Sequence, residues 1–283
     1  MTVIKRNMNY NEYDEDVLKH LQEVELMVLK DFIDICEKNK IEYFSYGGTT
    51  LGAIRHNGFI PWDDDIDVIM TKKNYEKFLK VMETEKNEKY EIINNRNTED
   101  FYFPYTLFNL KGTTIVDILH DKINYNYGIH IDLFILSNTP NNSLKRQLFI
   151  KKLKILHKIF FIFTVLQNDI YISSTKEKFG RTLKKLLKIF HITPNLFKKI
   201  FDKSVAKYEN ETSKNVCEAG YYYNKFPKEV WESTKKVEFE SIKINVPKDY
   251  DTFLKTTYGD YMKLPPKEQR KNHSPDSIDF GPY

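Results

Sequence analysis

Four aspartates stand within five positions, at Asp63, Asp64, Asp65 and Asp67. Burying this much negative charge is costly unless a cation compensates it. Carboxylate oxygens are hard ligands that favour Mg²⁺ or Mn²⁺, and a Mg²⁺ ion held by a few carboxylates usually completes its shell with water and substrate phosphates. The cluster therefore predicts a Mg²⁺ (or Mn²⁺) site that handles a phosphate-bearing substrate. A plain acidic loop is the alternative interpretation.

The spacing of the cluster predicts which of its carboxylates converge. Residues 65–70 alternate between polar and apolar before becoming fully apolar, as a strand does when it enters a core. Asp65 and Asp67 should therefore point to the same face of that strand. Asp64 should project the other way, as a solvated or loop-capping residue.

A third carboxylate is expected to complete such a site, and two candidates stand further along the chain. Asp132 lies in the apolar run 128–136, where an unpaired buried aspartate would cost several kcal/mol unless it is bonded or bound to metal. Asp117 has a similar setting, and Asp132 is favoured because its flanks are more continuously apolar. His130 shares the predicted face with Asp132, either as a hydrogen-bonded strand histidine or as a catalytic one.

Just before the aspartates lies a pattern suited to phosphate. Residues 41–46 read as a strand, Gly47 and Gly48 follow it, and a short helix is expected to start at Thr49. Paired glycines allow a close backbone approach, and free N–H groups at a helix start bind phosphate. Arg55, about two turns into the helix, could clamp an anionic substrate with two hydrogen bonds.

The elements that must position these residues can be outlined from hydrophobic periodicity. A helix over residues 12–38 carries an apolar stripe, and it should pack across the catalytic sheet with Cys36 in the core. A short helix should follow the aspartate strand at 73–82. Further strands are expected at 90–93, 105–110 and 113–118.

Composition narrows the class of protein. At 283 residues the chain can bury a sizeable core, and no apolar leader follows Met1. The apolar run at 159–166 is far below the roughly 20 residues that span a bilayer. Cys36 and Cys217 form neither a disulfide framework nor a zinc site, which suits a reducing compartment. These observations predict a cytoplasmic protein.

The middle of the chain is strongly basic. Residues 144–207 contain sixteen Lys or Arg against three acids, a net charge of +13, and because the whole chain carries +4 the remaining residues carry −9. Around residues 183–190 the spacing indicates a basic amphipathic helix. The segment could be a solvated helical lid or a contact with an anionic membrane surface. No nucleic-acid partner is expected, because no recognised binding motif accompanies the charge.

The run GGTTLGAIRHNGFIPWDDDIDVIM, residues 47–70, resembles the signature of the LicD-family phosphotransferases, the bacterial relatives of fukutin and fukutin-related protein. Residues 35–43 resemble the lead-in to that signature, and residues 258–266 resemble a C-terminal motif of the family. The likeness covers roughly residues 20–137 and 245–275. Thr49-Thr50 stands where Thr-Leu is usual.

The resemblance implies a nucleotidyltransferase-like α/β (α+β) fold, with a small mixed sheet flanked by helices, and the charge pattern adds a basic helical insertion. Together they divide the chain into a catalytic core at 1–137, the basic insertion or subdomain at 138–215 and a C-terminal part at 216–283 that packs back on the core. Within the matched blocks, the pair Gly47 and Gly48 corresponds to the family's glycine turn. Asp65 and Asp67 match its metal-binding pair, and Asp132 matches the third acid expected of the fold.

The activity that the resemblance implies is transfer of a phosphorylated alcohol, phosphocholine above all, from a CDP-activated donor to a glycan hydroxyl with release of CMP. The acceptor would be a teichoic-acid-type sugar or another cell-surface glycan, and it could be linked to lipid at the inner face of the membrane. Nucleotidyl transfer with release of pyrophosphate is an alternative, and so is a non-catalytic basic binding module. Aromatic residues at 101–105 or 221–223 could cage a quaternary ammonium, although a structural role is favoured because Tyr and Phe are plentiful.

Overall fold

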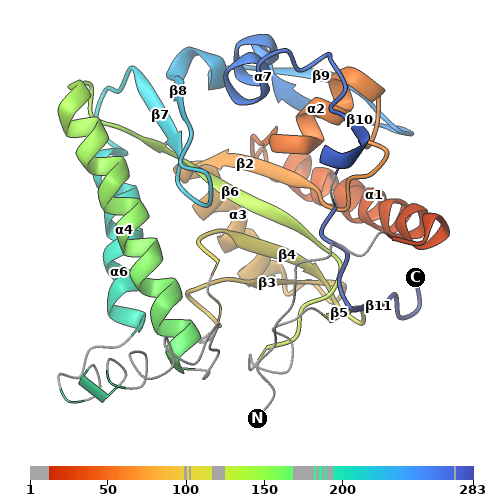
Figure 1. Cartoon of the computed structure of the whole chain (residues 1–283), viewed down its shortest axis with the longest axis horizontal. Coiled ribbons are helices and arrows are strands. Elements are labelled where there is room, and N and C mark those ends of the chain that lie inside the picture. Colours follow the sequence, from red (N-terminus) through yellow and green to blue (C-terminus); the bar gives the residue numbers. More distant parts are fainter. Residues whose placement is uncertain are drawn as a thin grey trace.

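The protein is analysed as a computed structural model that describes residues 13–98, 101, 103–116, 125–167, 182, 185, 186, 189, 194–270 and 272–283. The strands form a mixed sheet, and helices pack against both of its faces, as the sequence predicted (Figure 1). Within the described ranges, no helix combines the length and apolar character needed to cross a bilayer.

The main sheet is built around one central parallel pair. In spatial order its strands are β1 (Phe44–Ser45), β2 (Asp67–Thr71), β6 (His130–Asn138), β4 (Thr106–Leu110) and β3 (Tyr90–Ile93), and β7 (Asn215–Glu218) and β8 (Lys225–Pro227) extend it from the far end of β6. Strands β2 and β6 run parallel, and the other neighbours are antiparallel. The first residues of β2 and β6 therefore meet at the same end of the sheet.

Each face of the sheet has its own apolar core, because side chains alternate along a strand. Val68 and Met70 face the core that includes α1 (Glu15–Lys38) and α3 (Lys72–Glu85). Ile69, Phe134 and Leu136 face a second core with α2 (Gly47–His56) and α7 (Tyr250–Tyr258). Asp67 and Asp132 stand two residues before Ile69 and Phe134 on their strands, so their side chains point to the same face of the sheet. This is the face on which α2 lies.

Several expected elements are confirmed, and others differ at their ends. The strand at 90–93 is as expected, α1 begins at Glu15 with Asp14 capping it, and the helix expected at 73–82 extends over 72–85. The strand expected at 41–46 is only Phe44–Ser45. The strand expected from Asp65 starts at Asp67, so Asp65 lies in the preceding loop.

One expected strand belongs to a different sheet. β5 (Thr114–Val116) does not join the main sheet but pairs with β11 (Ser277–Asp279) near the end of the chain. A hairpin of β9 (Thr234–Phe239) and β10 (Ile242–Pro247) contacts β1 and α2. The β9–β10 hairpin of the C-terminal part thus packs beside α2, whereas β11 lies with β5 (Figure 1).

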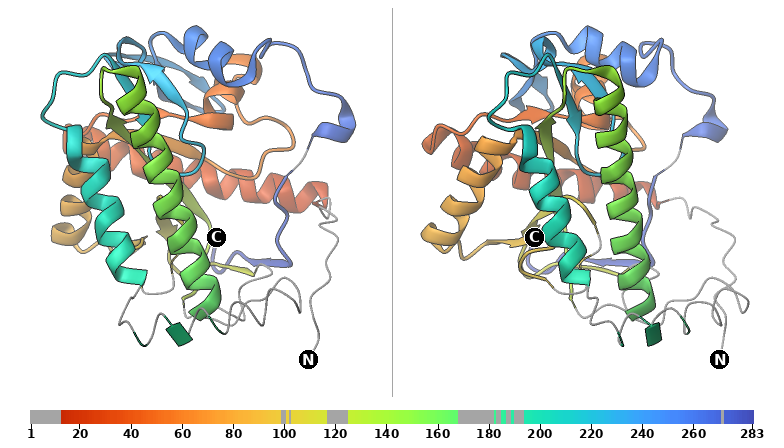
Figure 2. Two further views of the ribbon diagram at one scale, coloured as in Figure 1. Left: turned by 60° about the vertical axis from the view of Figure 1, so that its left-hand side comes forward. Right: turned by 90° about the vertical axis from the view of Figure 1, so that its left-hand side faces the viewer.

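The described part of the basic segment consists mainly of α4 (Ser143–Gln167) and α6 (Pro194–Val205). They pack side by side at the far end of β6, as Figure 2 shows from two directions. Phe149, Leu153 and Leu156 of α4 join the main core. The amphipathic helix expected around 183–190 lies largely outside the described residues. The three-part domain division stays a prediction.

Candidate functional site

Strand pairing places two of the predicted acids side by side. Asp67 at the start of β2 is the register partner of Asp132 on the parallel strand β6, and neighbouring strands lie about 4.8 Å apart. The N–H of Asp132 donates to the carbonyl of Ile66 at 2.9 Å, which continues the ladder past the end of β2. Both side chains therefore leave the same face of the sheet, next to each other.

Asp65 approaches this pair from the loop before β2. The loop is fixed from α1, where Nε2 of Gln22 donates to the carbonyl of Asp63 at 2.9 Å. Burial raises the pKa of Asp65 from 3.8 to about 6. Burial also raises the pKa of Asp67, and the negative charges of Asp65 and Asp132 raise it further. The three predicted acids thus form one electrostatic cluster.

The glycine turn presses against this cluster. The first residue of α2, Gly47, has a φ of +51°, and a Cβ atom there would collide with the carboxylate of Asp67. A Cβ atom at Gly48 would collide with the carboxylate of Asp63. Oγ1 of Thr49 accepts the backbone N–H of Asp67 at 2.8 Å. The positive end of α2 therefore faces carboxylates, and a phosphate arriving there would meet negative charge unless a cation lay between them.

Of the two roles expected for Asp64, solvated or loop-capping, the structure supports the second. Its side chain is only 3% exposed. Oδ2 accepts the backbone N–H of His273 at 2.7 Å, and Oδ1 lies 3.4 Å from Nδ1 of the same residue. The interaction with Asp64 raises the pKa of His273 to about 9. Asp64 thus fixes the C-terminal segment against the aspartate loop.

Glu25 is an acid of the site that the sequence analysis missed. It is 3% exposed on the buried face of α1, and Oε2 has no hydrogen-bond partner in the described part of the chain. Burial raises its pKa, and the charges of Asp65 and Asp64 raise it further. A signal for this acid is present in the sequence. Glu25 stands four residues after Leu21 and three before Val28, within the apolar stripe of the helix.

Glu218 holds a tyrosine loop beside the acids. This fully buried carboxylate accepts backbone N–H groups from Tyr221, Tyr222 and Tyr223 at 2.8, 2.8 and 2.7 Å. After burial, the charges of Asp67 and Asp65 contribute most to the raised pKa of Tyr222. The rings of Tyr221 and Tyr222 meet edge to face, with centroids 5.0 Å apart. The aromatic run at 221–223 therefore lies next to the carboxylates.

A second aromatic group and a histidine surround Asp132. Tyr105, in the run 101–105, hydrogen-bonds to the Asp132 carboxylate and packs on Phe134 with centroids 4.9 Å apart. Nδ1 of His130 lies 2.7 Å from the carbonyl of Gly128, and Nε2 lies 3.4 Å from Oδ1 of Asp132. Burial lowers the pKa of His130 and raises that of Asp132.

Arg55 sits in the last turn of α2, at the edge of the site. Nη1 donates to the carbonyl of Tyr261 at 2.8 Å, and Nε donates to Nε2 of His56 at 2.9 Å. The residue therefore links α2 to the C-terminal motif at 258–266, and its role as a phosphate clamp stays a prediction. The alternative third acid, Asp117, lies outside the described residues.

The donor atoms fit a hard divalent cation, because they are all carboxylate oxygens. Oδ1 of Asp132 is buried and has no hydrogen-bond partner among the described residues. As placed, however, no three Asp, Glu, His or Cys side chains of the described chain are grouped closely enough to hold one ion. A shared ion would have to draw Asp65, Asp67 and Asp132 together.

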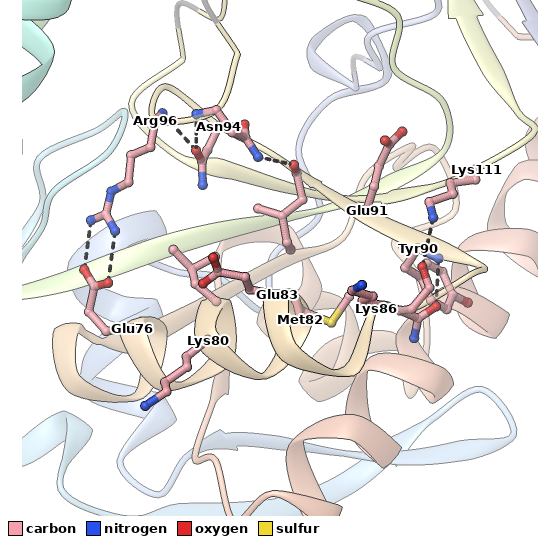
Figure 3. A pocket seen from close by; sticks show the side chains of 14 residues that line it. Glu76, Lys80, Met82, Glu83, Lys86, Tyr90, Glu91, Asn94, Arg96 and Lys111 are labelled. Carbon is pink, nitrogen blue, oxygen red and sulfur yellow. Dashed lines mark hydrogen bonds and ion pairs between the residues drawn. The ribbon is translucent and has the colours of Figure 1, made fainter.

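A separate hollow of about 820 Å³ lies between α3 and the edge strand β3 (Figure 3). Its charged lining is largely engaged within the protein. Both terminal nitrogens of Arg96 bind the carboxylate of Glu76, and Nζ of Lys111 donates to the carbonyl of Asn87. None of the predicted site residues lines this hollow.

Comparison with known proteins covers the whole site. The family described as "LicD/FKTN/FKRP, nucleotidyltransferase domain" matches residues 40–154, which include every predicted site residue. The chain is 32% identical over 271 residues to the lipopolysaccharide cholinephosphotransferase LicD of Haemophilus influenzae, covering 90% of this chain and 95% of that protein. An uncharacterised protein of Rickettsia typhi is 36% identical over 112 residues, 38% of this chain and 36% of that protein.

Proposed function

The chain belongs to the LicD family, and from this premise we propose that it transfers phosphocholine from CDP-choline to a sugar hydroxyl of a cell-surface glycan. The observation that carries the proposal is the 32% identity to a lipopolysaccharide cholinephosphotransferase along nearly the whole of both chains. Lipopolysaccharide is the acceptor named for that relative, and a teichoic-acid-type sugar is a second acceptor of the same chemical class.

We propose Mg²⁺ or Mn²⁺ as the cofactor, held by Asp65, Asp67 and Asp132. Support comes from the clustering of buried carboxylates and from the helix start that faces them. When bound, the ion supplies positive charge that stabilises the phosphates of the donor. Neutralising the cluster would also let a phosphate approach the amide groups of Gly47, Gly48 and Thr49 at the start of α2.

We assign Asp132 as the base that takes the proton of the acceptor hydroxyl. As the acceptor oxygen attacks the phosphorus of the choline phosphate, the new P–O bond forms in line with the bond that breaks to CMP. The hydroxyl proton passes to the Asp132 carboxylate, which we propose as the general base. The hydrogen bond from Tyr105 holds that carboxylate in place.

The cationic end of the donor has a suitable surface nearby. Tyr105 and Tyr222 both lie against the carboxylate cluster, and Tyr221 meets Tyr222 edge to face. Electron-rich ring faces attract quaternary ammonium groups. We therefore assign the choline group to these tyrosines, and the donor phosphates to α2 with Arg55 at its end.

A product assay tests the proposal. The purified protein is incubated with CDP-choline, other CDP-alcohols and nucleoside triphosphates, with Mg²⁺ and a glycan acceptor, and its products are separated. We expect CMP and a choline-phosphate-modified glycan from CDP-choline. Release of pyrophosphate from a triphosphate would instead establish nucleotidyl transfer. Absence of any product from a protein that binds Mg²⁺ would indicate a non-catalytic module.

A further inference from the structure

The outer face of α4 has a pattern that the catalytic site does not explain. Leu144, Leu148, Ile155 and Ile162 are 66%, 58%, 46% and 46% exposed, and Phe161, which is 37% exposed, lies about 100° further round the helix. At about 100° per residue the first four positions fall within about 40° of one another around the helix. They therefore form one continuous apolar stripe, named the α4 stripe below.

The stripe lies opposite the face that α4 uses for folding. Phe149, Leu153 and Leu156 are buried in the main core, and they project from the other side of the helix. The helix thus has two apolar faces, and among the described residues only one of them is covered. Exposed apolar surface that is contiguous and bordered by polar residues marks an interaction site more often than isolated exposed residues do.

Lysines border the stripe on both sides. Lys151 and Lys158 flank one edge, and Lys145 and Lys152 flank the other, and all four are exposed. Residues 143–167 include no acid at all. None of these four lysines forms an ion pair with a described residue, so their charges are available to an external partner.

We propose that the α4 stripe docks on an anionic lipid surface, with its apolar side chains entering the headgroup boundary and the flanking lysines meeting lipid phosphates. An amphipathic helix with a basic border lies in the membrane interface in this way, with its apolar face buried about 5–10 Å. A second copy of this chain fits less well, because its α4 would present the same positive charge. A nucleic-acid backbone would satisfy the lysines and leave the apolar stripe in water.

The docking surface lies on a different face of α4 from the residue that meets the tyrosine loop. His157, which packs on Tyr223 with ring centroids 6.0 Å apart, stands about 140° or more around the helix from the stripe. The proposal does not rest on the proposed function, because vesicle binding needs no turnover. Turnover on a soluble acceptor and binding to lipid can therefore be measured independently.

Vesicle sedimentation tests the proposal with the full-length protein. One set of vesicles contains phosphatidylcholine alone, and the other contains equal parts of phosphatidylcholine and phosphatidylglycerol. We expect binding to the anionic vesicles at low salt, at least about tenfold weaker binding to the neutral ones, and loss of binding as salt screens the lysines.

Two double variants separate the contributions of the stripe and its border. Leu148→Gln with Ile155→Gln removes apolar contact, and Lys151→Glu with Lys158→Glu reverses the border charge. Each pair should weaken partitioning by about tenfold or more. Lys73→Glu with Lys80→Glu, on exposed positions of α3, changes the net charge equally and should weaken partitioning far less. Circular dichroism and thermal unfolding verify that each variant is folded.

Three results would overturn the proposal. One is equal sedimentation with neutral and anionic vesicles, and another is a loss of binding as large in the α3 control as in the α4 variants. The third is a dimer in solution that Leu148→Gln with Ile155→Gln dissociates while the parent protein ignores anionic vesicles. That result would assign the stripe to a second copy of the chain.

Discussion

The carboxylate cluster and the outer face of α4 are both rich in charge, but they hold it in opposite ways. Asp67 and Asp132 are placed by strand register and packed against a glycine turn, with most of their surface buried. Lys151 and Lys158 are exposed side chains seven residues apart on α4. Buried like charges interact strongly, whereas exposed charges are screened. Substitutions should therefore have large, interdependent effects in the cluster and small, additive effects on α4.

The largest effect is expected from Asp67→Asn and Asp132→Asn. Each removes a carboxylate from the cluster, and we expect turnover to fall by more than about 100-fold, since even residues that only support metal ligands cost 10- to 100-fold. Without divalent metal, the variants should unfold at the same or a higher temperature, because like-charge repulsion is relieved. CMP release and thermal unfolding in EDTA measure the two effects.

Asp34→Asn is the matched control, because Asp34 is exposed on α1. It should leave both turnover and stability close to those of the parent protein. Near-normal turnover of Asp67→Asn at saturating Mn²⁺ would remove Asp67 from the metal site, and the same result for Asp132→Asn would return attention to Asp117.

Gly47→Ala should destabilise the protein more than Gly259→Ala does. Both glycines have a positive φ, so both substitutions introduce backbone strain of about 1–3 kcal/mol. Only at Gly47 would the new methyl group also collide with a carboxylate, that of Asp67, whereas nothing lies within 4 Å at Gly259. Overpacking of this kind adds about 1–3 kcal/mol. Urea unfolding of both variants measures the difference, and equal losses would show that the turn is not packed against Asp67 in solution.

Arg55→Lys should weaken binding of the donor while leaving the Mg²⁺ dependence of turnover unchanged. Lysine keeps the charge but lacks the planar fork that binds a phosphate with two hydrogen bonds. Titration with CDP-choline measures the affinity. An unchanged affinity would reduce Arg55 to its structural link with Tyr261.

Stability should depend on pH in a direction opposite to that of an ordinary salt-bridged protein. Burial raises the pKa of Asp65 from 3.8 to about 6 and that of Glu218 from 4.5 to about 7. The folded state therefore binds protons more tightly than the unfolded state, so the stability from these groups is present at low pH and is lost as pH rises from about 4 to 7. In EDTA the unfolding temperature should fall across that interval.

Saturating Mg²⁺ should reduce this fall, because the ion binds the ionised carboxylates of the folded protein. Differential scanning calorimetry at several pH values, with and without Mg²⁺, measures both effects. Burial lowers the pKa of His157 to about 4, which adds stability as pH rises over the same interval. The test therefore compares the parent protein with Asp65→Asn in EDTA, and an identical pH dependence of the two unfolding temperatures would contradict the buried placement of Asp65.

Local sequence patterns were sufficient to identify the main carboxylates of the site and the strands that carry them. The alternation at 65–70 correctly predicted that Asp67 enters a buried strand, and the apolar run around Asp132 correctly predicted a second one. The pairing of these strands depends on which segments become neighbours in the sheet, and no local pattern encodes that. The register of Asp67 with Asp132 therefore emerges only from the fold.

Local sequence patterns do not predict the surroundings of a residue where a distant segment of the chain provides them. Asp64 reads as a solvated or loop-capping residue, and the backbone that it caps is that of His273, which lies 209 positions further along the chain. The strand expected at 113–118 is the shorter β5, and its partner near the C-terminus could not be read from local pattern. Glu25 is different, because an acid within a core-facing stripe is a local signal.

The smallest expected effects are those of single substitutions on α4. Lys151→Ala and Lys158→Ala should each change the unfolding free energy by no more than about 0.5 kcal/mol, because both side chains are exposed and unpaired among the described residues. Each should weaken partitioning to anionic vesicles by about fivefold, since a lysine near such a surface contributes about 1 kcal/mol. Because the two charges act independently, the double variant should show the product of the two factors.

In the cluster, by contrast, Asp67→Asn combined with Asp132→Asn should lose little more turnover than either change alone, because groups that act as a unit fail together. Vesicle partitioning and CMP release of both sets of variants provide the comparison. Strong coupling between the two lysines would mean that they bind one site jointly, and independent losses at the two aspartates would mean that they do not share an ion.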